Sequence, residues 1–394
     1  MQITICGGGN AGHTLAGLLS ARRTNAVHVY LPYGDEAQRW QEAIAEQGSL
    51  RVRRQHGPSG ESLLQGKPLQ ISADPAEVIS HSQLIILALP AFAHGSTLSE
   101  IAPYLKPGAW VGAMPARGGF QQCAQQALGD RLADLTLFGL QTLPWACRIQ
   151  EYGREVVILG TKAEVGLAVS PATRAIDVAQ VLHWLLDLPV RLVSTFLALT
   201  LSDTGQIIHP GIMYGLFADW DGASFDQPPL FYQGVDESTA QILQGISDEI
   251  QNLRHLLELQ LPDLDLSAVH PLKEWLLRSY PGSIEDEGSL RSCFLSNRSY
   301  TGLTVPTRPT PDGRCLPDFS ARYLSEDIPY NLLVTRGIAE LAGLDVPTMD
   351  KVITWAQTQL NKDYLCDGHL TGRDLNLSRA PQRYGIKSLQ EMLW

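Results

Sequence analysis

Three glycines near the start of the chain have the spacing of a phosphate-binding turn. They follow the pattern G-x-G-x-x-G between an apolar stretch at residues 3–6 and apolar residues at helical intervals over 13–20. In such a turn the glycines permit a tight bend, close approach of a pyrophosphate, and close packing of helix on strand, while the helix N-terminus favours anions. The alternative is a glycine-rich turn without a ligand. The cofactor contacts that we expect in this turn are Gly7, Gly9, Asn10, Ala11 and Gly12.

The second expected strand bears on the choice between NAD and NADP. In a dinucleotide fold the strand at residues 27–31 should end beside the adenosine ribose, where an acid selects NAD and an arginine favours NADP. Asp35 follows this strand, and Arg39 comes one helical turn later, so both kinds of side chain are near the ribose site. The acidic residues near the strand end favour NAD over NADP.

Polar residues follow three further apolar stretches, at 84–89, 109–114 and 135–140. Such runs are typical of parallel strands covered on both faces, and the carboxyl ends of parallel strands meet at the edge where α/β proteins bind ligands. We therefore expect Pro90 and Ala91 to contact the cofactor. An arginine in the second of these loops could clamp a carboxylate, the alternative being a surface salt bridge. The other side chains after these strands are His94, which we interpret as a helix-start histidine near solvent, Arg117, Gln141 and Thr142.

His209 is a candidate for proton transfer. A proline follows it, and a buried histidine at a helix start is suited to acid–base chemistry near neutral pH. Taken alone, the residue is more simply a histidine satisfied within a core. Residues 322–329 (RYLSEDIP) predict a helix that starts at Ser325 or Glu326, with Asp327 in its first turn. The alternative for this stretch is a capping pattern with a solvated arginine.

The composition of the chain indicates which binding partners and which cellular compartment to expect. The formal net charge of −11 argues against nucleic acid or an anionic membrane as a partner. The six cysteines show neither a C-x-x-C pair nor a metal-ligand spacing, so we expect no metal. The chain opens directly on a strand pattern without a signal peptide, and no apolar run reaches about 18 residues. We expect a cytoplasmic protein.

The elements that position these residues are expected to form two domains. A chain of 394 residues is longer than one compact hydrophobic core usually accommodates. Residues 48–73 are compatible with a small β insertion, and 155–160 continue the strand series. From residue 199 the pattern becomes helical, as over 240–259. The expected fold class is α/β plus all-α. A Rossmann-type doubly wound parallel sheet in 1–198 would bind NAD(P), and a helical substrate domain would occupy 199–394.

Motifs along the whole chain resemble those of a known family. They are residues 7–15 (GGGNAGHTL), 89–94 (LPAFAH), 142–149 (TLPWACRI), 159–162 (LGTK), 209–210 (HP), 230–234 (LFYQG), 322–329 (RYLSEDIP) and 381–385 (PQRYG). In this order they resemble the octopine dehydrogenase branch of the opine dehydrogenase family. The resemblance covers essentially the whole chain and favours catalytic interpretations of His209 and of residues 322–327.

The resemblance implies a reductive condensation. An α-keto acid, pyruvate above all, and the amine of an amino acid would form an imine, which a nicotinamide cofactor reduces to an opine. By resemblance, His209 is the acid–base residue and Asp327 fixes its tautomer, while Arg322 orients a substrate carboxylate or completes that network. Thr142 would contact the keto acid, and Cys147 and Trp275 would line the amino-acid pocket.

Two positions depart from the family pattern. Gln141 is neutral where arginine-using relatives carry a carboxylate, which makes arginine a poorer substrate. Arg117 replaces a neutral glutamine, and we hypothesise that it binds an extra or differently placed carboxylate. Asp203 would either attract a cationic group or cap a helix.

Two other functions are compatible with the sequence. A related reductase would act on a plain 2-keto acid or sugar phosphate without any amine, and a regulatory protein would sense the nicotinamide cofactor without turnover. The partners expected for the enzyme are small-molecule substrates. A monomer and a homodimer are both compatible with the sequence.

Overall fold

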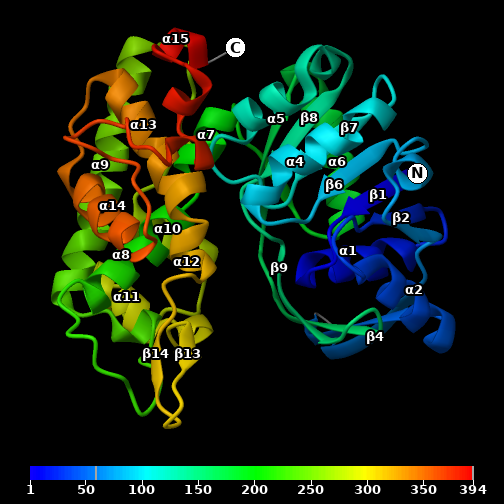
Figure 1. Cartoon of the computed structure of the whole chain (residues 1–394), viewed down its shortest axis with the longest axis horizontal. Coiled ribbons are helices and arrows are strands. Elements are labelled where there is room, and N and C mark those ends of the chain that lie inside the picture. The colour runs from blue at the N-terminus through cyan, green and yellow to red at the C-terminus, as the bar shows by residue number, and fades with distance from the viewer. Residues whose placement is uncertain (58–59, 393–394) are drawn as a thin grey trace. The chain divides into compact units, whose positions relative to one another are not determined.

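The computed structural model describes residues 1–57 and 60–392. The chain divides into two compact units, Met1–Leu199 and Thr200–Trp394. The first is built around a sheet and the second is mainly helical (Figure 1).

The first unit contains an eight-stranded sheet in the order β12-β11-β8-β7-β6-β1-β2-β5. Its strands are β1 (Gln2–Cys6), β2 (Ala26–Tyr30), β5 (Gln70–Ser72), β6 (Leu84–Leu87), β7 (Trp110–Ala113), β8 (Thr136–Leu140), β11 (Val165–Ser170) and β12 (Val190–Leu192). The six strands from β5 to β8 pair in parallel, and β11 lies antiparallel to β8. Chain order runs outward in both directions from β1, as a doubly wound sheet requires, so the predicted fold class is confirmed.

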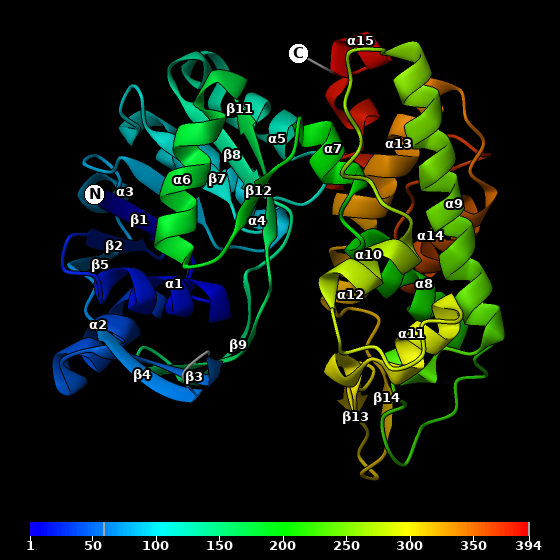
Figure 2. The same ribbon diagram turned by 180° about the vertical axis from the view of Figure 1, so that it is seen from behind.

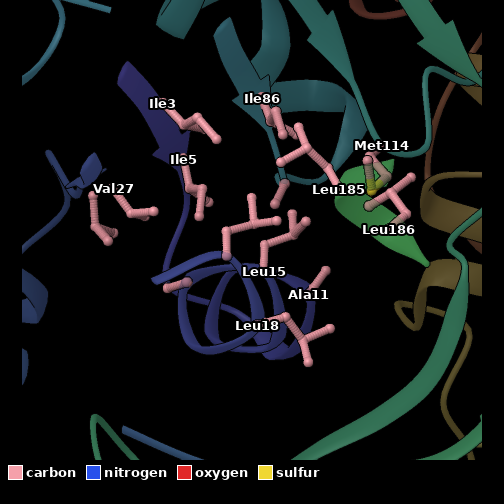
Figure 3. Packing of buried hydrophobic residues seen from close by; sticks show 14 of the residues in the cluster. Ile3, Ile5, Ala11, Leu15, Leu18, Val27, Ile86, Met114, Leu185 and Leu186 are labelled. Carbon is pink, nitrogen blue, oxygen red and sulfur yellow. The ribbon is translucent and has the colours of Figure 1, made fainter. Parts of the chain in front are cut away.

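Helices cover both faces of this sheet. They are α1 (Asn10–Ser20), α2 (Glu36–Gln47), α3 (Pro75–Val78), α4 (Ala91–Ile101), α5 (Phe120–Leu128), α6 (Ala175–Leu186) and α7 (Phe196–Leu201). α4 and α5 lie on one face, and α1 and α6 lie on the other (Figures 1 and 2). In Figure 3, Leu15 of α1 and Leu185 of α6 face the strand residues Ile5 and Ile86. This apolar core fixes the glycine turn between β1 and α1.

A second sheet of the first unit has the order β4-β3-β10-β9. Its strands are β3 (Leu50–Gly57), β4 (Gly60–Gly66), β9 (Trp145–Glu151) and β10 (Glu155–Thr161). The prediction that residues 155–160 extend the main sheet is therefore wrong. β10 pairs with β9 through a tight turn and with β3 of the predicted β insertion, whose residues 58–59 lie outside the described part. Val52 and Val156 bury side chains in the core under α1, which explains the pairing.

The second unit is mainly helical. Its helices are α8 (Gly205–Phe217), α9 (Glu237–Gln260), α10 (Leu272–Ser279), α11 (Leu290–Ser296), α12 (Arg322–Ser325), the π-helical turn η6 (Ile328–Leu332), α13 (Leu333–Ala342), α14 (Pro347–Gln359) and α15 (Leu389–Met392). The short strands β13 (Thr307–Pro309) and β14 (Cys315–Pro317) form a hairpin sheet that we did not predict. Among the described residues, no helix combines the length and apolar character that a membrane span needs.

Two glycines allow α8 to approach α9 closely. A Cβ on Gly211 would lie 2.6 Å from Cδ2 of Leu243, and one on Gly215 would overlap the side chain of Thr239. Both glycines lie on one face of α8, four residues apart. This face packs on α9, and the resulting helix pair fixes the position of His209, two residues before Gly211.

Candidate active site

The glycine turn of the first unit has the shape that a dinucleotide requires. Gly7 has a φ of +120°, and a Cβ there would lie 2.6 Å from the carbonyl oxygen of Ala88. A Cβ on Gly12 would overlap the carbonyl oxygen of Gly7. At Gly9, the residue before α1, a Cβ would have no described atom within 4 Å, so the space in front of the helix N-terminus is open. These residues fit a pyrophosphate group.

His13 anchors this turn from inside the first unit. Its Nδ1 donates a hydrogen bond to the carbonyl oxygen of Gly9 over 3.2 Å, and its Nε2 accepts one from the backbone N–H of Gly153 over 2.8 Å. The ring stacks on Trp40 with 3.8 Å between centroids. Burial lowers the pKa of His13 to about 4, so the ring is neutral near pH 7.

The other predicted cofactor residues border the turn. The side-chain oxygen of Asn10 accepts a hydrogen bond from the backbone N–H of Ile149 at 2.8 Å, which ties the turn to β9. Ala11 is buried in the first turn of α1. Pro90 caps α4 and Ala91 opens it, at the carboxyl end of β6. Their contact with a cofactor stays a prediction.

The acidic residue nearest the glycine turn is not the one that we predicted. Asp35 and Arg39 form an exposed ion pair with 3.4 Å between Oδ1 and Nη1. Glu36, the first residue of α2, instead points Oε2 to within 3.0 Å of a Cβ placed on Gly8. Burial raises the pKa of Glu36. The available signal was the expectation of an acidic residue about 20 residues beyond the glycine motif. This spacing could not distinguish Asp35 from the adjacent Glu36.

Positively charged side chains lie in the loops after β7 and near the end of β8. Arg117 is half-buried and has a φ of +61°, a left-handed conformation that is strained for an arginine. Lys162 donates a hydrogen bond from Nζ to Oγ1 of Thr142 over 3.0 Å. Sequence reasoning missed Lys162, although it closes the LGTK motif. The backbone N–H of Gln141 donates to the carbonyl oxygen of Gly166 in β11 at 2.9 Å.

Two residues of the first unit are more buried than we expected. His94 is fully buried rather than near solvent, because α4 packs on α5, and its Nε2 donates to the carbonyl oxygen of Leu89 at 3.0 Å. Cys147 lies in the core under α1 with 3% exposure, and burial raises the pKa of its thiol. β9 turns this side chain inward, and its role in lining a substrate pocket stays a prediction.

His209 and Asp327 of the second unit form a direct pair. Nδ1 of His209 lies 2.8 Å from Oδ2 of Asp327, and the two side chains are 21% and 2% exposed. Tyr323 stacks on the imidazole with 4.2 Å between ring centroids and 12° between planes. His209 lies in the second turn of α8 and not at a helix start. The Nδ1 contact leaves Nε2, on the opposite edge of the ring, to exchange a proton with a substrate.

The RYLSEDIP stretch folds differently from the prediction. α12 begins at Arg322, and Asp327 directly precedes η6. The backbone N–H of Asp327 donates a hydrogen bond to the carbonyl oxygen of Arg322 over 3.3 Å. The guanidinium of Arg322, with its side chain 59% exposed, pairs with Glu326. It therefore does not complete the His209–Asp327 network, and its predicted contact with a substrate carboxylate stays open.

Sequence reasoning missed Asn331, which lies behind Asp327. Its Nδ2 donates to Oδ1 of Asp327 over 2.8 Å and to Oδ2 of Asp203 over 3.1 Å. Asp203 also accepts a hydrogen bond from the backbone N–H of Gly205 at 2.9 Å, in the first turn of α8. The capping alternative for Asp203 is thus the one that the structure supports. A single asparagine within a helical stretch carries no signal of such a role.

Trp275 belongs to a series of aromatic rings in the second unit. Its ring lies 6.1 Å from that of Tyr280, which in turn lies 5.1 Å from Tyr300. Tyr300 stacks on Tyr232 with 3.9 Å between centroids. Burial and the neighbouring tyrosines and Asp327 raise the pKa of Tyr232 well above its ordinary value, so its hydroxyl stays protonated. The predicted contact of Trp275 with an amino acid is not tested by this geometry.

A dinucleotide turn on a doubly wound sheet, together with a carboxylate-paired histidine on a helical unit, is the combination expected of a nicotinamide-dependent oxidoreductase. The sequence pattern described as "NAD/NADP octopine/nopaline dehydrogenase, alpha-helical domain" matches residues 192–360. Octopine dehydrogenase of Mizuhopecten yessoensis is 38% identical over 100% of this chain and 98% of its own. Tauropine dehydrogenase of Arabella iricolor is 38% identical, over 99% of each chain.

Solved structures of octopine dehydrogenase share the fold of the whole chain. The complex with NADH and L-arginine has a TM-score of 0.93 at 37% identity, covering 99% of this chain and 97% of the other. The complex with NADH and pyruvate has a TM-score of 0.90 at 36% identity with the same coverage. The chain belongs to the opine dehydrogenase family. It is an oxidoreductase that acts on CH–NH bonds with a nicotinamide cofactor.

Proposed function

We propose that this enzyme uses NADH to condense pyruvate with the amine of a neutral amino acid, and that it also catalyses the reverse oxidation. The observation that carries the proposal is the His209–Asp327 pair, with 2.8 Å between Nδ1 and Oδ2, in a chain that also has the dinucleotide turn. Relatives that are named octopine and tauropine dehydrogenase, and solved octopine dehydrogenase complexes with NADH and pyruvate, support both substrate classes and the cofactor.

His209 performs the proton transfers of the condensation. The neutral Nε2 accepts a proton from the substrate ammonium, which frees the amine to attack the keto carbon. The resulting imidazolium returns the proton to the hydroxyl of the carbinolamine, which leaves as water, and a protonated imine forms. Asp327 accepts the Nδ1–H hydrogen bond and so holds the ring in the tautomer with a free Nε2, while it stabilises the imidazolium. NADH supplies the hydride that reduces the imine carbon.

The turn residues hold the cofactor through its phosphates. Gly7 and Gly12 create the bend, the open position at Gly9 admits the pyrophosphate, and the N-terminus of α1 faces its charge. Asn10 and Ala11 belong to the same turn, and Pro90 and Ala91 border it from α4. Glu36 binds the adenosine ribose hydroxyls, which replaces the role that we assigned to Asp35 and Arg39.

Charged side chains of the enzyme anchor the substrate carboxylates. We propose that Thr142 and Lys162 bind the carboxylate of the keto acid, and that Arg117 binds the carboxylate of the amino acid or a second carboxylate. Arg322 is a further candidate for a carboxylate contact.

Arg117→Ala and Lys162→Met should each raise the KM of one substrate about tenfold or more, because a charge-assisted hydrogen bond is lost. Steady-state kinetics with each substrate varied in turn provide the measurement. Unchanged KM values for both substrates in Arg117→Ala would contradict its role.

Gln141 determines the choice of amino acid in this proposal. A neutral amide offers no charge to pair with a guanidinium, and an unpaired buried guanidinium is costly. We therefore expect neutral amino acids to be better substrates than arginine. Trp275, in the aromatic series of the second unit, is our candidate for contact with the amino-acid side chain.

The decisive experiment follows NADH absorbance with pyruvate or 2-oxoglutarate against arginine, alanine, glycine and taurine, with NADPH in parallel. Oxidation that depends on the amine establishes the opine reaction and identifies the substrate pair. Oxidation with keto acid alone would instead indicate a plain keto-acid reductase. NADH binding without turnover across the panel would contradict the proposed substrates and favour the cofactor sensor.

His209→Asn tests the assignment of the acid–base residue. We expect kcat to fall about 100-fold or more, since general acid–base catalysis contributes that much. The Kd for NADH, measured by fluorescence titration, should be unchanged, because the turn residues bind the cofactor. His369→Asn is a suitable control, since its side chain is 70% exposed. Turnover at the wild-type rate in His209→Asn would rule out the acid–base role.

The proposal also covers the cellular compartment and the oligomeric state of the enzyme. We assign the enzyme to the cytoplasm because six free cysteines in the described chain suit a reducing compartment. Microscopy of a tagged chain tests this assignment. Monomer and homodimer are both compatible with the proposal, and light scattering on the purified protein distinguishes them.

A further inference from the structure

We propose that Asn331 and Asp203 are positioning residues that hold the His209–Asp327 pair in its reactive geometry. The inference rests on the proposed acid–base role of His209. It extends that role to a buried layer of side chains that contacts neither substrate nor cofactor in our mechanism. Asn331 acts on Asp327, and Asp203 acts on both Asn331 and the first turn of α8.

The four side chains form a continuous hydrogen-bonded chain. Oδ2 of Asp327 contacts His209 over 2.8 Å, and Oδ1 of the same carboxylate accepts from Nδ2 of Asn331 over 2.8 Å. Nδ2 also donates to Oδ2 of Asp203 over 3.1 Å. One amide therefore serves two carboxylates, one with each of its two N–H groups. Because both oxygens of Asp327 are engaged, its plane cannot rotate away from the imidazole without breaking a bond.

Burial makes these bonds important. Asp203, Asp327 and Asn331 are 7%, 1% and 1% exposed, so water competes little for their polar atoms. Two carboxylates this deep in a protein need donors, because an unpaired buried carboxylate strongly destabilises the fold. The amide of Asn331 supplies a donor to both without adding a positive charge. Asp327 is thus held for its pairing with His209 by a neutral neighbour, in a site where water competes little for these bonds.

The network also joins the two elements that carry the reactive pair. Asp327 and Asn331 lie one turn apart around η6, and His209 lies on α8. Asp203 precedes α8 and binds the backbone N–H of Gly205 over 2.9 Å, so it fixes the start of that helix. The Asp203–Asn331 bond therefore sets the distance between α8 and η6. A change of about 1 Å in that distance would separate Nδ1 of His209 from its carboxylate.

Asn331→Leu removes both donors and keeps the branched shape and the number of heavy atoms of the side chain. We expect kcat to fall about 10- to 100-fold, as is usual when a residue that orients a reactive group is lost. The KM values and the Kd for NADH should change by less than about threefold, because Asn331 contacts no substrate. Asn297→Leu is the matched control. Asn297 is fully buried in the same unit and caps a different turn, so this variant should lose stability but retain kcat within about twofold.

A double-mutant cycle with His209→Asn separates positioning from general damage. If Asn331 acts through His209, Asn331→Leu should not lower the residual kcat of His209→Asn any further. Additive losses would overturn the inference. If Asn331→Leu does not fold, Asp203→Ser provides the same test. Its hydroxyl can still cap α8 but does not reach Asn331, so we expect a kcat loss of about 3- to 10-fold.

The two proposals fail in distinguishable ways. Full activity of His209→Asn would contradict the acid–base role itself and leave no pair to position. A large loss in His209→Asn, together with unchanged kcat in Asn331→Leu and Asp203→Ser, would contradict only the positioning role. A loss in all three variants that is not additive supports both proposals.

Discussion

At the scale of single residues, our proposal assigns the choice of cofactor to Glu36. Its carboxylate lies beside Gly8 in the dinucleotide turn, and in the proposed complex it accepts hydrogen bonds from the ribose hydroxyls. Glu36→Gln should weaken NADH binding about tenfold or more, since a hydrogen bond to a charged group is replaced by a neutral one. It should weaken NADPH binding less, because the carboxylate repels a 2′-phosphate. Fluorescence titration with both cofactors measures the change in preference.

The same carboxylate predicts a pH dependence of binding. Burial raises the pKa of Glu36, so the charged form is lost at a higher pH than for an ordinary glutamate. The Kd for NADH should therefore increase as pH falls through this raised pKa, and the increase should be smaller in Glu36→Gln, which lacks the titrating carboxylate. Asp35→Asn is the control, because Asp35 is exposed and pairs with Arg39. An equal effect of both substitutions would return the role to Asp35.

Residue types in motifs revealed the reactive pair but not its surroundings. His209 and Asp327 could be predicted because each lies in a distinctive motif, whereas spacing alone did not show that α8 and η6 bring them together. The roles that we propose for Asn331, Lys162 and Glu36 depend on their positions in the folded chain. Each is a common residue type for its element, so no pattern separates it from its neighbours. The burial of Cys147 could not be predicted, because the direction of a side chain on β9 depends on the strand register.

At the scale of elements, the approach of α8 to α9 depends on two glycines. Gly215→Ala places a methyl group into Thr239, a fully buried β-branched residue that cannot move aside easily. We expect the free energy of unfolding to fall by about 1–3 kcal/mol from overpacking. The higher helix propensity of alanine offsets only part of this loss. Thermal unfolding of the intact enzyme should show a lower Tm.

Gly95→Ala is the matched control for this substitution. Gly95 also lies inside a helix, but a Cβ there would meet only Sγ of Cys123, at an ordinary contact distance of 3.4 Å. Alanine should therefore stabilise α4 by up to about 1 kcal/mol. If both variants had the same Tm, the close contact between α8 and α9 would not limit stability.

Elements with local signals were predictable, and elements formed by distant pairing were not. Apolar runs identified β6, β7 and β8, and helical periodicity identified α9, because these signals lie within a few residues. β10 was assigned to the wrong sheet because its partner β3 precedes it by about 100 residues, and nothing local records that pairing. β13 and β14 are three residues long and contain prolines, so their alternation is too short to detect.

At the scale of the whole molecule, acid should destabilise the enzyme through His13. Nε2 of His13 accepts a hydrogen bond from the backbone N–H of Gly153, so a proton on Nε2 would place two donors face to face. The pKa of His13 is about 4 in the folded chain and 6.5 in the ordinary case. Because the unfolded chain binds this proton more readily, stability is complete above pH 6.5 and decreases as pH falls towards 4. The loss amounts to about 3 kcal/mol.

Urea unfolding of the whole enzyme at pH 7 and pH 5 tests this coupling. Wild type should lose more free energy of unfolding between the two values than His13→Gln, which lacks the titrating ring but is less stable at pH 7. His369→Gln, at a largely exposed position, should show the wild-type difference. An unchanged difference in His13→Gln would mean that other groups cause the acid sensitivity. Since His13 holds the carbonyl of Gly9, the Kd for NADH should rise over the same pH range, which links stability of the first unit to cofactor binding.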